Sequence, residues 1–170
     1  MSAAAFSFAN GRRRDCLALA AALLTLGPAG AADAPPLELQ LAASDGHPAL
    51  SDGGPGRATY IDFWASWCTP CRLSFPWMNE MHDRYAGRGL RIVAIGLDRR
   101  DTDARRFLQQ AQPRFSIALD PAAESARRLD VQAMPSSFLF STERRLIFSH
   151  RGFRLDDRAE LERRLQAALG

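Results

Sequence analysis

A short apolar segment that runs into two closely spaced cysteines limits what this chain can fold into. Residues 58–64 (Ala-Thr-Tyr-Ile-Asp-Phe-Trp) have the length of a buried strand and are rich in β-branched and aromatic side chains. Cys68 and Cys71 follow after a brief connection, and a helix is expected from about Thr69 to Tyr85. The sequence therefore places a Cys-Thr-Pro-Cys motif where a buried strand meets a helix N-terminus.

The position of Cys68 favours a reactive thiolate. Unpaired N–H groups and the macrodipole at a helix N-terminus stabilise negative charge, so the thiol pKa should fall. Cys71 lies one turn inside the helix, and Pro70 is tolerated before it because first-turn N–H groups have no helical partner. A very short loop favours redox chemistry over structural stapling. A structural disulfide, or a copper site made from both thiolates and a distant His, remain the alternatives.

Asp62 lies inside the apolar strand. Strand alternation puts it on the same face as Tyr60 and Trp64. A carboxylate there is costly unless it is neutral, paired or hydrated. We expect a desolvated carboxyl with a raised pKa that acts on the buried Cys71. The alternative is a partly exposed Asp at the end of the sheet.

A second feature is Met134-Pro135 at the start of the strand expected at Ser136–Phe140. Pro cannot donate to a sheet ladder, so it belongs at the start or the edge of a strand. A cis bond would turn the chain sharply and expose the Met134 backbone to an extended substrate segment. The residues alone do not decide between cis and trans.

The remaining elements predict an α/β fold. Helices between successive strands imply parallel pairing, and a final hairpin adds antiparallel strands, so a mixed β-sheet flanked by helices is expected. Three helix starts are also predicted: Asp101 or Thr102 as a cap, Pro121 in a first turn, and Asp157 with Glu160 as a capping box. The expected strands are 37–41, 90–97, 115–119, 137–140 and 146–149, and the expected helices are 101–112, 121–129 and 157–169.

The N-terminus has the pattern of a secretory signal. Residues 1–32 hold three consecutive Arg, an apolar stretch and an Ala-Gly-Ala cleavage site, with a retained membrane anchor as the alternative. A linker at 33–36 would precede one domain at 37–170. Residues 33–170 carry 19 Arg against 18 acidic residues, which excludes the charge excess typical of a nucleic-acid partner. The absence of Lys excludes P-loop and Schiff-base chemistry.

The segment Tyr60–Arg72, with Pro76 in the following helix and Met134-Pro135 further on, resembles the thioredoxin superfamily. Within it, the chain is most similar to the TlpA/ResA-like branch. The resemblance covers about residues 37–169. It implies a thioredoxin fold with an inserted strand and helix between Asp98 and Met134 and an N-terminal strand extension.

The resemblance also implies roles for residues. Cys68 would be the attacking thiolate, Cys71 the resolving thiol, and Asp62 the buried acid, with the Cys68–Cys71 disulfide as the redox group and no other cofactor or metal. Ser74 and Ser136 stand where members dedicated to cytochrome c maturation usually or often carry Glu. The expected substrate-binding residues are Trp67, Thr69, Pro70, Met134, Pro135 and Gly152.

The expected function is thiol–disulfide exchange on exported proteins in the periplasm, most simply as a monomeric reductant. Apocytochrome c and copper-centre assembly proteins are candidate clients. Because no nicotinamide or flavin fingerprint is present, reducing power would come from a membrane electron donor of the DsbD/CcdA type. The alternatives are a net disulfide oxidant or isomerase, and a copper-handling module that uses both thiolates.

Overall fold

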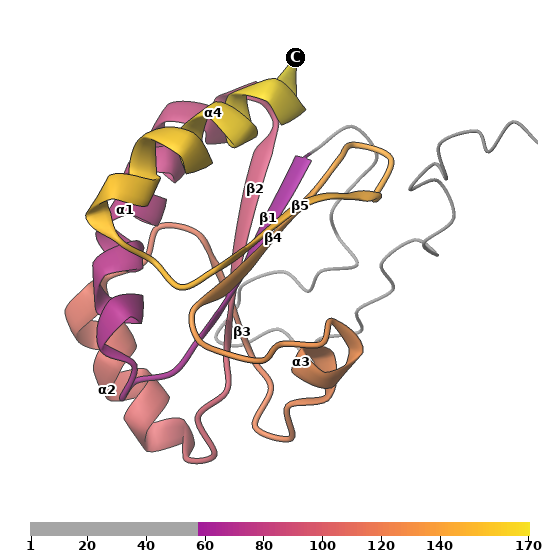
Figure 1. The fold of residues 1–170 in the computed structure, drawn as a ribbon. Helices are drawn as coiled ribbons and strands as arrows, with labels where there is room; N and C mark the ends of the chain where they lie inside the picture. The colour runs from indigo at the N-terminus through magenta and orange to yellow at the C-terminus, as the bar shows by residue number, and fades with distance from the viewer. Residues whose placement is uncertain (1–57) are drawn as a thin grey trace, which may run out of the picture. The chain divides into compact units, whose positions relative to one another are not determined.

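The computed structural model describes residues 58–170 (Figure 1). The predicted strand at 37–41, the linker and the signal segment lie outside the described residues. In chain order the elements are β1 (Ala58–Trp64), α1 (Thr69–Tyr85), β2 (Leu90–Gly96), α2 (Asp101–Ala111), β3 (Ser116–Leu119), α3 (Glu124–Arg128), β4 (Ser136–Phe140), β5 (Leu146–Arg151) and α4 (Arg158–Leu169), with 3₁₀ turns at Ala86–Arg88 and Leu155–Asp157.

The described strands form one five-stranded sheet in the order β3-β2-β1-β4-β5. β1 runs parallel to β2, and β2 runs parallel to β3. β4 is antiparallel to both β1 and β5. The mixed sheet is therefore confirmed, with β1 bonded on both sides. Asp62 in β1 is paired with Ala94 of β2 and with Ser137 of β4.

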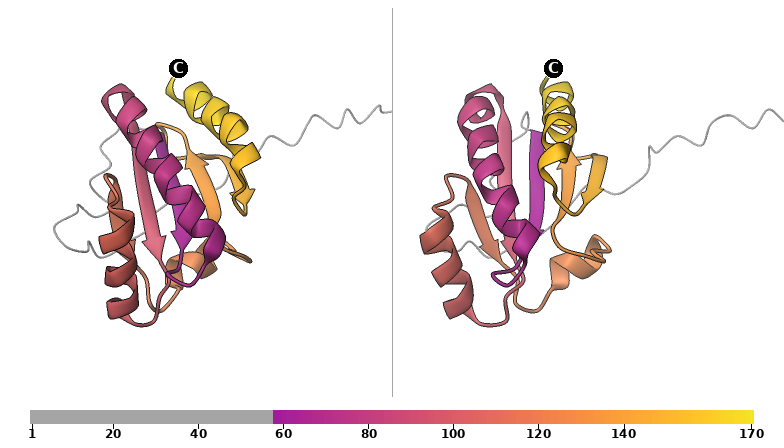
Figure 2. Two further views of the ribbon diagram at one scale, coloured as in Figure 1. Left: turned by 90° about the vertical axis from the view of Figure 1, so that its left-hand side faces the viewer. Right: turned by 60° about the vertical axis from the view of Figure 1, so that its left-hand side comes forward.

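Helices cover both faces of this sheet. α1, α2 and α4 lie over one face, and α3 lies on the other (Figures 1 and 2). Tyr60 and Trp64 pack with α1 and α4 in the larger core cluster, whereas Ile61 and Phe63 pack in a second cluster that includes Ala126 of α3. The alternation predicted for β1 is thus observed, since its successive side chains point to opposite faces.

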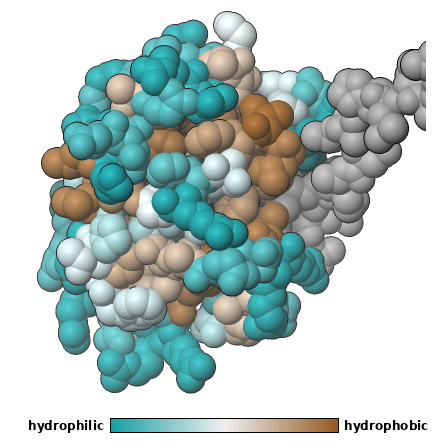
Figure 3. Space-filling model, viewed as in Figure 1, coloured by the Kyte–Doolittle hydropathy of each residue, from teal (hydrophilic) through white to brown (hydrophobic). Residues whose placement is uncertain are grey.

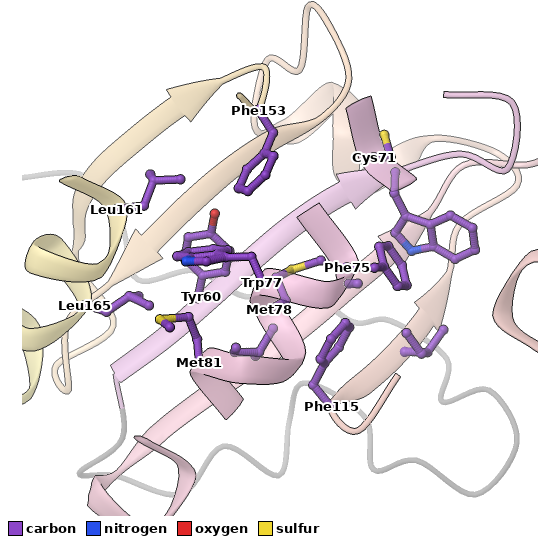
Figure 4. Close-up of a cluster of buried hydrophobic side chains, with 14 of the residues drawn as sticks. Tyr60, Cys71, Phe75, Trp77, Met78, Met81, Phe115, Phe153, Leu161 and Leu165 are labelled. Atoms are coloured by element: carbon purple, nitrogen blue, oxygen red, sulfur yellow. The ribbon is translucent and has the colours of Figure 1, made fainter. Parts of the chain in front are cut away.

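Aromatic side chains fill the space under α1 (Figure 4). The ring centroid of Phe75 lies 4.8 Å from that of Phe107 in α2 and 5.5 Å from that of Phe115. Trp77 packs against Phe153, with ring centroids 5.6 Å apart. Burial of side chains this large contributes about 1.5–3 kcal/mol each, so α1 is held firmly against the sheet.

The predicted start of α3 is wrong. A helix was expected over 121–129 with Pro121 in its first turn, but α3 spans only Glu124–Arg128. The buried Asp120 carboxylate accepts the backbone N–H groups of Glu124 and Ser125 at 3.0 and 2.7 Å. Ala123 adopts a left-handed φ of 54° immediately before the helix. These contacts hold residues 121–123 in a turn.

The side-chain caps expected for α2 and α4 do not form, although Asp157 does occupy the N-cap position of α4. α2 begins at Asp101, and the preceding Arg100 makes no side-chain cap. Before α4, the carboxylate of Asp157 accepts the N–H of Arg154 at 2.8 Å and so closes the 3₁₀ turn that precedes the helix. Glu160 does not complete a capping box; it pairs with arginines further along α4.

One face of the molecule carries mostly polar side chains. On the face seen in Figure 3, hydrophilic residues predominate and hydrophobic atoms appear in separate patches. Among residues 58–170, none of the helices combines the length and the apolar character that a membrane span requires.

We expect Gly96→Ala to destabilise the fold. A Cβ at Gly96 would lie 2.9 Å from Cδ2 of Leu119 and 2.9 Å from Cζ2 of the buried Trp64. Because such overpacking forces side chains off their rotamers, the free energy of unfolding should fall by about 1–3 kcal/mol in a denaturant titration. Gly87→Ala is the matched control, since nothing lies within 4 Å of its Cβ. Equal effects of the two substitutions would contradict the close approach at Gly96.

Candidate active site

Cys68 and Cys71 form a disulfide at the junction of β1 and α1, with Cα atoms 5.3 Å apart. Cys68 is the N-cap of α1, and its Sγ accepts the backbone N–H of Cys71 at 3.3 Å. Cys71 is fully buried, whereas 5% of Cys68 is exposed. Cys68 is therefore the member of the pair that keeps some exposed surface, and Cys71 has none.

The loop before Cys68 is held by a residue that the sequence reasoning missed. The buried Asp98, which follows β2, accepts both the N–H and the Oγ–H of Ser66 at 2.8 Å. The parallel register continues past Trp64 opposite Gly96, so Ser66 lies beside Asp98. Asp98 could have been found from the sequence, because it is a polar residue directly after the strand predicted at 90–97.

Arg72 also ties this loop to α1. It donates to the carbonyl of Ser66 at 2.9 Å, and its guanidinium carbon lies 5.4 Å from the ring centroid of Phe107. It is exposed, but it folds back across the loop because a carbonyl and an aromatic face are within its reach.

Asp62 is buried, with 1% of its surface exposed, as predicted. Its Oδ1 accepts the hydroxyl of Ser137 at 2.7 Å, while its Oδ2 is buried without a hydrogen-bond partner. Burial raises the pKa of Asp62 to about 7, although the hydrogen bond from Ser137 acts in the opposite direction. The partly exposed alternative is therefore wrong, and the carboxyl can change protonation near neutral pH.

Ser137 was predicted only as a strand residue. Its place opposite Asp62 in the β1–β4 register explains the contact between them. Burial, together with the negative charge of Asp62, also raises the pKa of Tyr60 well above its ordinary value, so that hydroxyl stays protonated. The hydroxyl of Ser137 thus donates to Asp62, and the neighbouring Tyr60 stays neutral.

The second flank of the site is the turn into β4. The Met134–Pro135 peptide bond is cis, and the carbonyl of Pro135 accepts the N–H of Gly152 at 2.7 Å. Gly152 has a φ of +79°, which disfavours any side chain there. Ser136 donates to the carbonyl of Ala133 at 2.7 Å, so it supports the turn from within.

The structure brings the predicted site residues to one end of the sheet. The end of β1 pairs with the start of β4, Phe63 opposite Ser136, and Met134 packs against the core cluster that contains both cysteines. Trp67 and Thr69 are exposed and Pro70 is half-buried. Within residues 58–170, no group of three or more His, Cys, Asp or Glu side chains is arranged to hold a metal ion.

Solved structures support the same fold. A crystal structure from Chlorobium tepidum, of a protein assigned as the thiol:disulfide interchange protein DsbE, is 43% identical, with a TM-score of 0.74. The match covers 78% of this chain and 93% of that one. StoA from Bacillus subtilis is 21% identical with a TM-score of 0.64, covering 77% of this chain and 98% of its own. The predicted thioredoxin-like fold is therefore confirmed.

Curated relatives are named for the chemistry of a cysteine pair. The thiol-disulfide oxidoreductase ResA of Bacillus thuringiensis subsp. konkukian is 30% identical over 105 residues, which are 62% of this chain and 61% of the relative. The chain thus matches less than two thirds of the length of that relative. The family model described as Redoxin matches residues 28–165, most of the sequence. This chain belongs to the Redoxin family, with the ResA-like and DsbE-like proteins among its relatives.

Proposed function

We propose that this chain catalyses thiol–disulfide exchange on exported proteins, and that it acts as a reductant. The observation that carries the proposal is the disulfide at the N-terminus of α1, in which Cys68 Sγ accepts an N–H and Cys71 is sealed in the core. The names of the ResA and DsbE relatives support this chemistry.

The exchange proceeds in two balanced steps. The Cys68 thiolate of the reduced protein attacks one sulfur of a client disulfide; the client S–S bond breaks, and the released sulfur takes a proton. Cys71, once deprotonated, attacks Cys68 Sγ; the mixed disulfide breaks and the client leaves with its second sulfur reduced. Two electrons pass from the Cys68–Cys71 pair to the client, and the Cys68–Cys71 disulfide remains. The two client sulfurs are protonated by the one proton that Cys71 releases and by one proton from solvent.

Asp62 is suited to take the proton from Cys71. It shares its face of β1 with Tyr60 and Trp64, and both pack in the cluster that contains Cys71. Its unpartnered Oδ2 offers a proton acceptor, and its pKa of about 7 matches the operating pH of a general base. The pair formed by Ser137 and Asp62 leaves this one oxygen available.

The surroundings of Cys68 favour a reductant over an oxidant. Strong oxidants stabilise their reduced thiolate with additional donors or cations. Here one N–H, that of Cys71, reaches the sulfur, and Pro70 has none to offer. The guanidinium of Arg72 is engaged by Ser66 and Phe107. The thiolate is therefore only moderately stabilised.

The wider setting is also part of the proposal. We place the protein in the periplasm as a monomer, reduced by a membrane donor of the DsbD/CcdA type. Ser74 donates to the carbonyl of Cys71 and Ser136 to that of Ala133, so neither position presents a carboxylate to a client. We therefore favour general disulfide clients, including copper-centre proteins, over a dedicated apocytochrome c substrate.

Cys68 and Cys71 should differ sharply in reactivity. Alkylation of the reduced protein at mildly acid pH should modify Cys68 first, because its thiolate is stabilised at the helix N-terminus. Peptide mass spectrometry distinguishes these two cysteines from Cys16. Cys71→Ser should accumulate a mixed disulfide with a client, and Cys68→Ser should lower kcat/KM by about 10³-fold or more. Preferential alkylation of Cys71 would reverse the assigned roles.

Asp62→Asn should stabilise the protein in a pH-dependent way. At pH 3 and below, Asp62 is largely protonated in both the folded and the unfolded chain, so the substitution should change little. Between pH 4 and 7 the carboxyl ionises in the unfolded chain but stays protonated in the folded one. The increase in the free energy of unfolding caused by Asp62→Asn should therefore grow to about 4 kcal/mol. Above pH 7 it should level off. Denaturant titrations across this range measure it, and a gain independent of pH would contradict the raised pKa.

The same substitution should slow resolution of the mixed disulfide more than the initial attack by Cys68. Stopped-flow single turnovers separate the two steps. Ser137→Ala is the matched variant, because it keeps the carboxyl but removes the donor that lowers its pKa. Its resolution rate should need a higher pH to reach its plateau. An unchanged resolution rate in Asp62→Asn would exclude the proton-transfer role.

The midpoint potential should lie between roughly −220 and −280 mV, towards thioredoxin at about −270 mV and away from DsbA at about −120 mV. The reason is the sparse stabilisation of the Cys68 thiolate described above. Equilibration with glutathione buffers, followed by thiol quantification, measures it. A midpoint above roughly −160 mV would indicate a disulfide donor instead.

A further inference from the structure

A depression of about 180 Å³ lies beside the candidate active site, between the loop before Cys68 and α2. Trp67 and Arg72 line it from one side, and Asp103, Arg106 and Gln110 line it from α2, with Phe107 between them. Trp67 is 71% exposed. The cysteines are not among the lining residues, so a group held here would be a neighbour of the reacting sulfur.

The acidic side chains of α2 form ion pairs, whereas one arginine that lines the depression does not. Asp103 pairs with Arg100 at 2.6 Å, and Asp101 pairs with Arg105 at 2.5 Å. The acidic side chains of α2 are therefore neutralised by other arginines. Arg106 lines the depression and forms no ion pair within the part of the chain that the structure describes.

Arg72 adds a second, pre-positioned cation. Its contacts with the Ser66 carbonyl and the Phe107 ring hold it without neutralising its charge. Two guanidinium groups thus border one depression whose own carboxylate, Asp103, is already paired. A guanidinium presents donors in a fork that matches a carboxylate. The site therefore suits a group with a single negative charge and two acceptor oxygens.

We propose that this depression binds an acidic side chain of the client polypeptide, close in sequence to the cysteine that exchanges with Cys68. Arg106 recognises the carboxylate, and the exposed face of Trp67 packs against the client chain. The inference rests on the proposed function and adds a client preference to it. We assign the carboxylate to a polypeptide because the depression lies beside the cysteines rather than over them. A carboxylate bound there would belong to a residue that flanks the reacting cysteine of the client.

The expected preference is modest because the pair is exposed. An ion pair at a protein surface changes a binding or rate constant by a factor of about two to five, and added salt weakens this effect. The preference should therefore appear as a difference in kcat/KM between matched clients at low ionic strength, and it should shrink as salt is added.

The test uses short synthetic peptides with one internal disulfide that differ at a single position. Glu, Gln or Lys is placed in turn at each of the two positions on either side of one cysteine, and reduction by the full chain is followed by stopped flow. At one or more positions the wild type should reduce the Glu peptide about two- to five-fold faster than the Gln peptide. Arg106→Glu should abolish this preference and favour the Lys peptide.

Arg105→Glu is the matched control. It makes the same change of charge one residue away, where the side chain pairs with Asp101 outside the depression. It should keep the preference for the Glu peptide. If Arg105→Glu loses the preference for the Glu peptide to the same extent, only the long-range electrostatic field acts and the inference is overturned. It is also overturned if the wild type shows no preference at any position.

A parallel measurement with glutathione disulfide separates the two sources of a carboxylate. A rate that depends on Arg106 for glutathione disulfide but not for the peptides would assign the depression to small thiols and overturn the proposal. Reduction of the Gln peptide is the reference throughout. If that peptide is not reduced at all, the proposed function itself fails; if it is reduced without preference, only this inference fails.

Discussion

The pairing of β1 on both of its edges is the constraint on which the rest of the site depends. β2 holds it on one side and β4 on the other, so the end of β1 is fixed before the chain turns into α1. Asp98 continues the contact from β2 and anchors Ser66, while the turn at Pro135 enters from β4. Cys68 is thereby presented between two supports from residues distant in sequence.

The same strand carries the buried carboxyl, and this creates a conflict between stability and chemistry. Ionising Asp62 inside the core opposes folding above its unfolded pKa, whereas proton transfer from Cys71 needs the ionised form. The single hydrogen bond from Ser137 moderates the penalty without removing it, because burial still raises the pKa to about 7. The carboxyl of Asp62 thus titrates near neutral pH.

The two flanks of the disulfide differ in chemistry. On one flank, the cis turn at Pro135 is held by the N–H of Gly152. This turn offers backbone groups, and hydrogen bonds from them to a client backbone would not depend on the side chains of the client. On the other, Arg72 and Arg106 line the depression beside Trp67, where we propose that they select by charge. A client could therefore be held by its backbone on one side and selected by a flanking side chain on the other.

Much of this arrangement was predictable from local pattern. The strand at 58–64, the helix at 69–85, the mixed sheet and the burial of Asp62 follow from periodicity and from the Cys-Thr-Pro-Cys motif, because these signals lie within a few residues of one another. The start of α3 and the capping box of α4 were mispredicted. Asp120 accepts the N–H groups of Glu124 and Ser125, and Asp157 accepts the N–H of Arg154, and helix propensity does not predict either contact.

The sequence by itself determined which residues are capable of redox chemistry and where the strand and helix that hold them lie. Only the tertiary structure decided what surrounds them: Asp98 contacts Ser66, Ser137 contacts Asp62, and Arg72 contacts Phe107. It also places Arg106, which forms no ion pair within residues 58–170, beside Trp67. The reason is physical. Each of these contacts joins segments about 30 to 75 residues apart, and strand register and helix packing place them together.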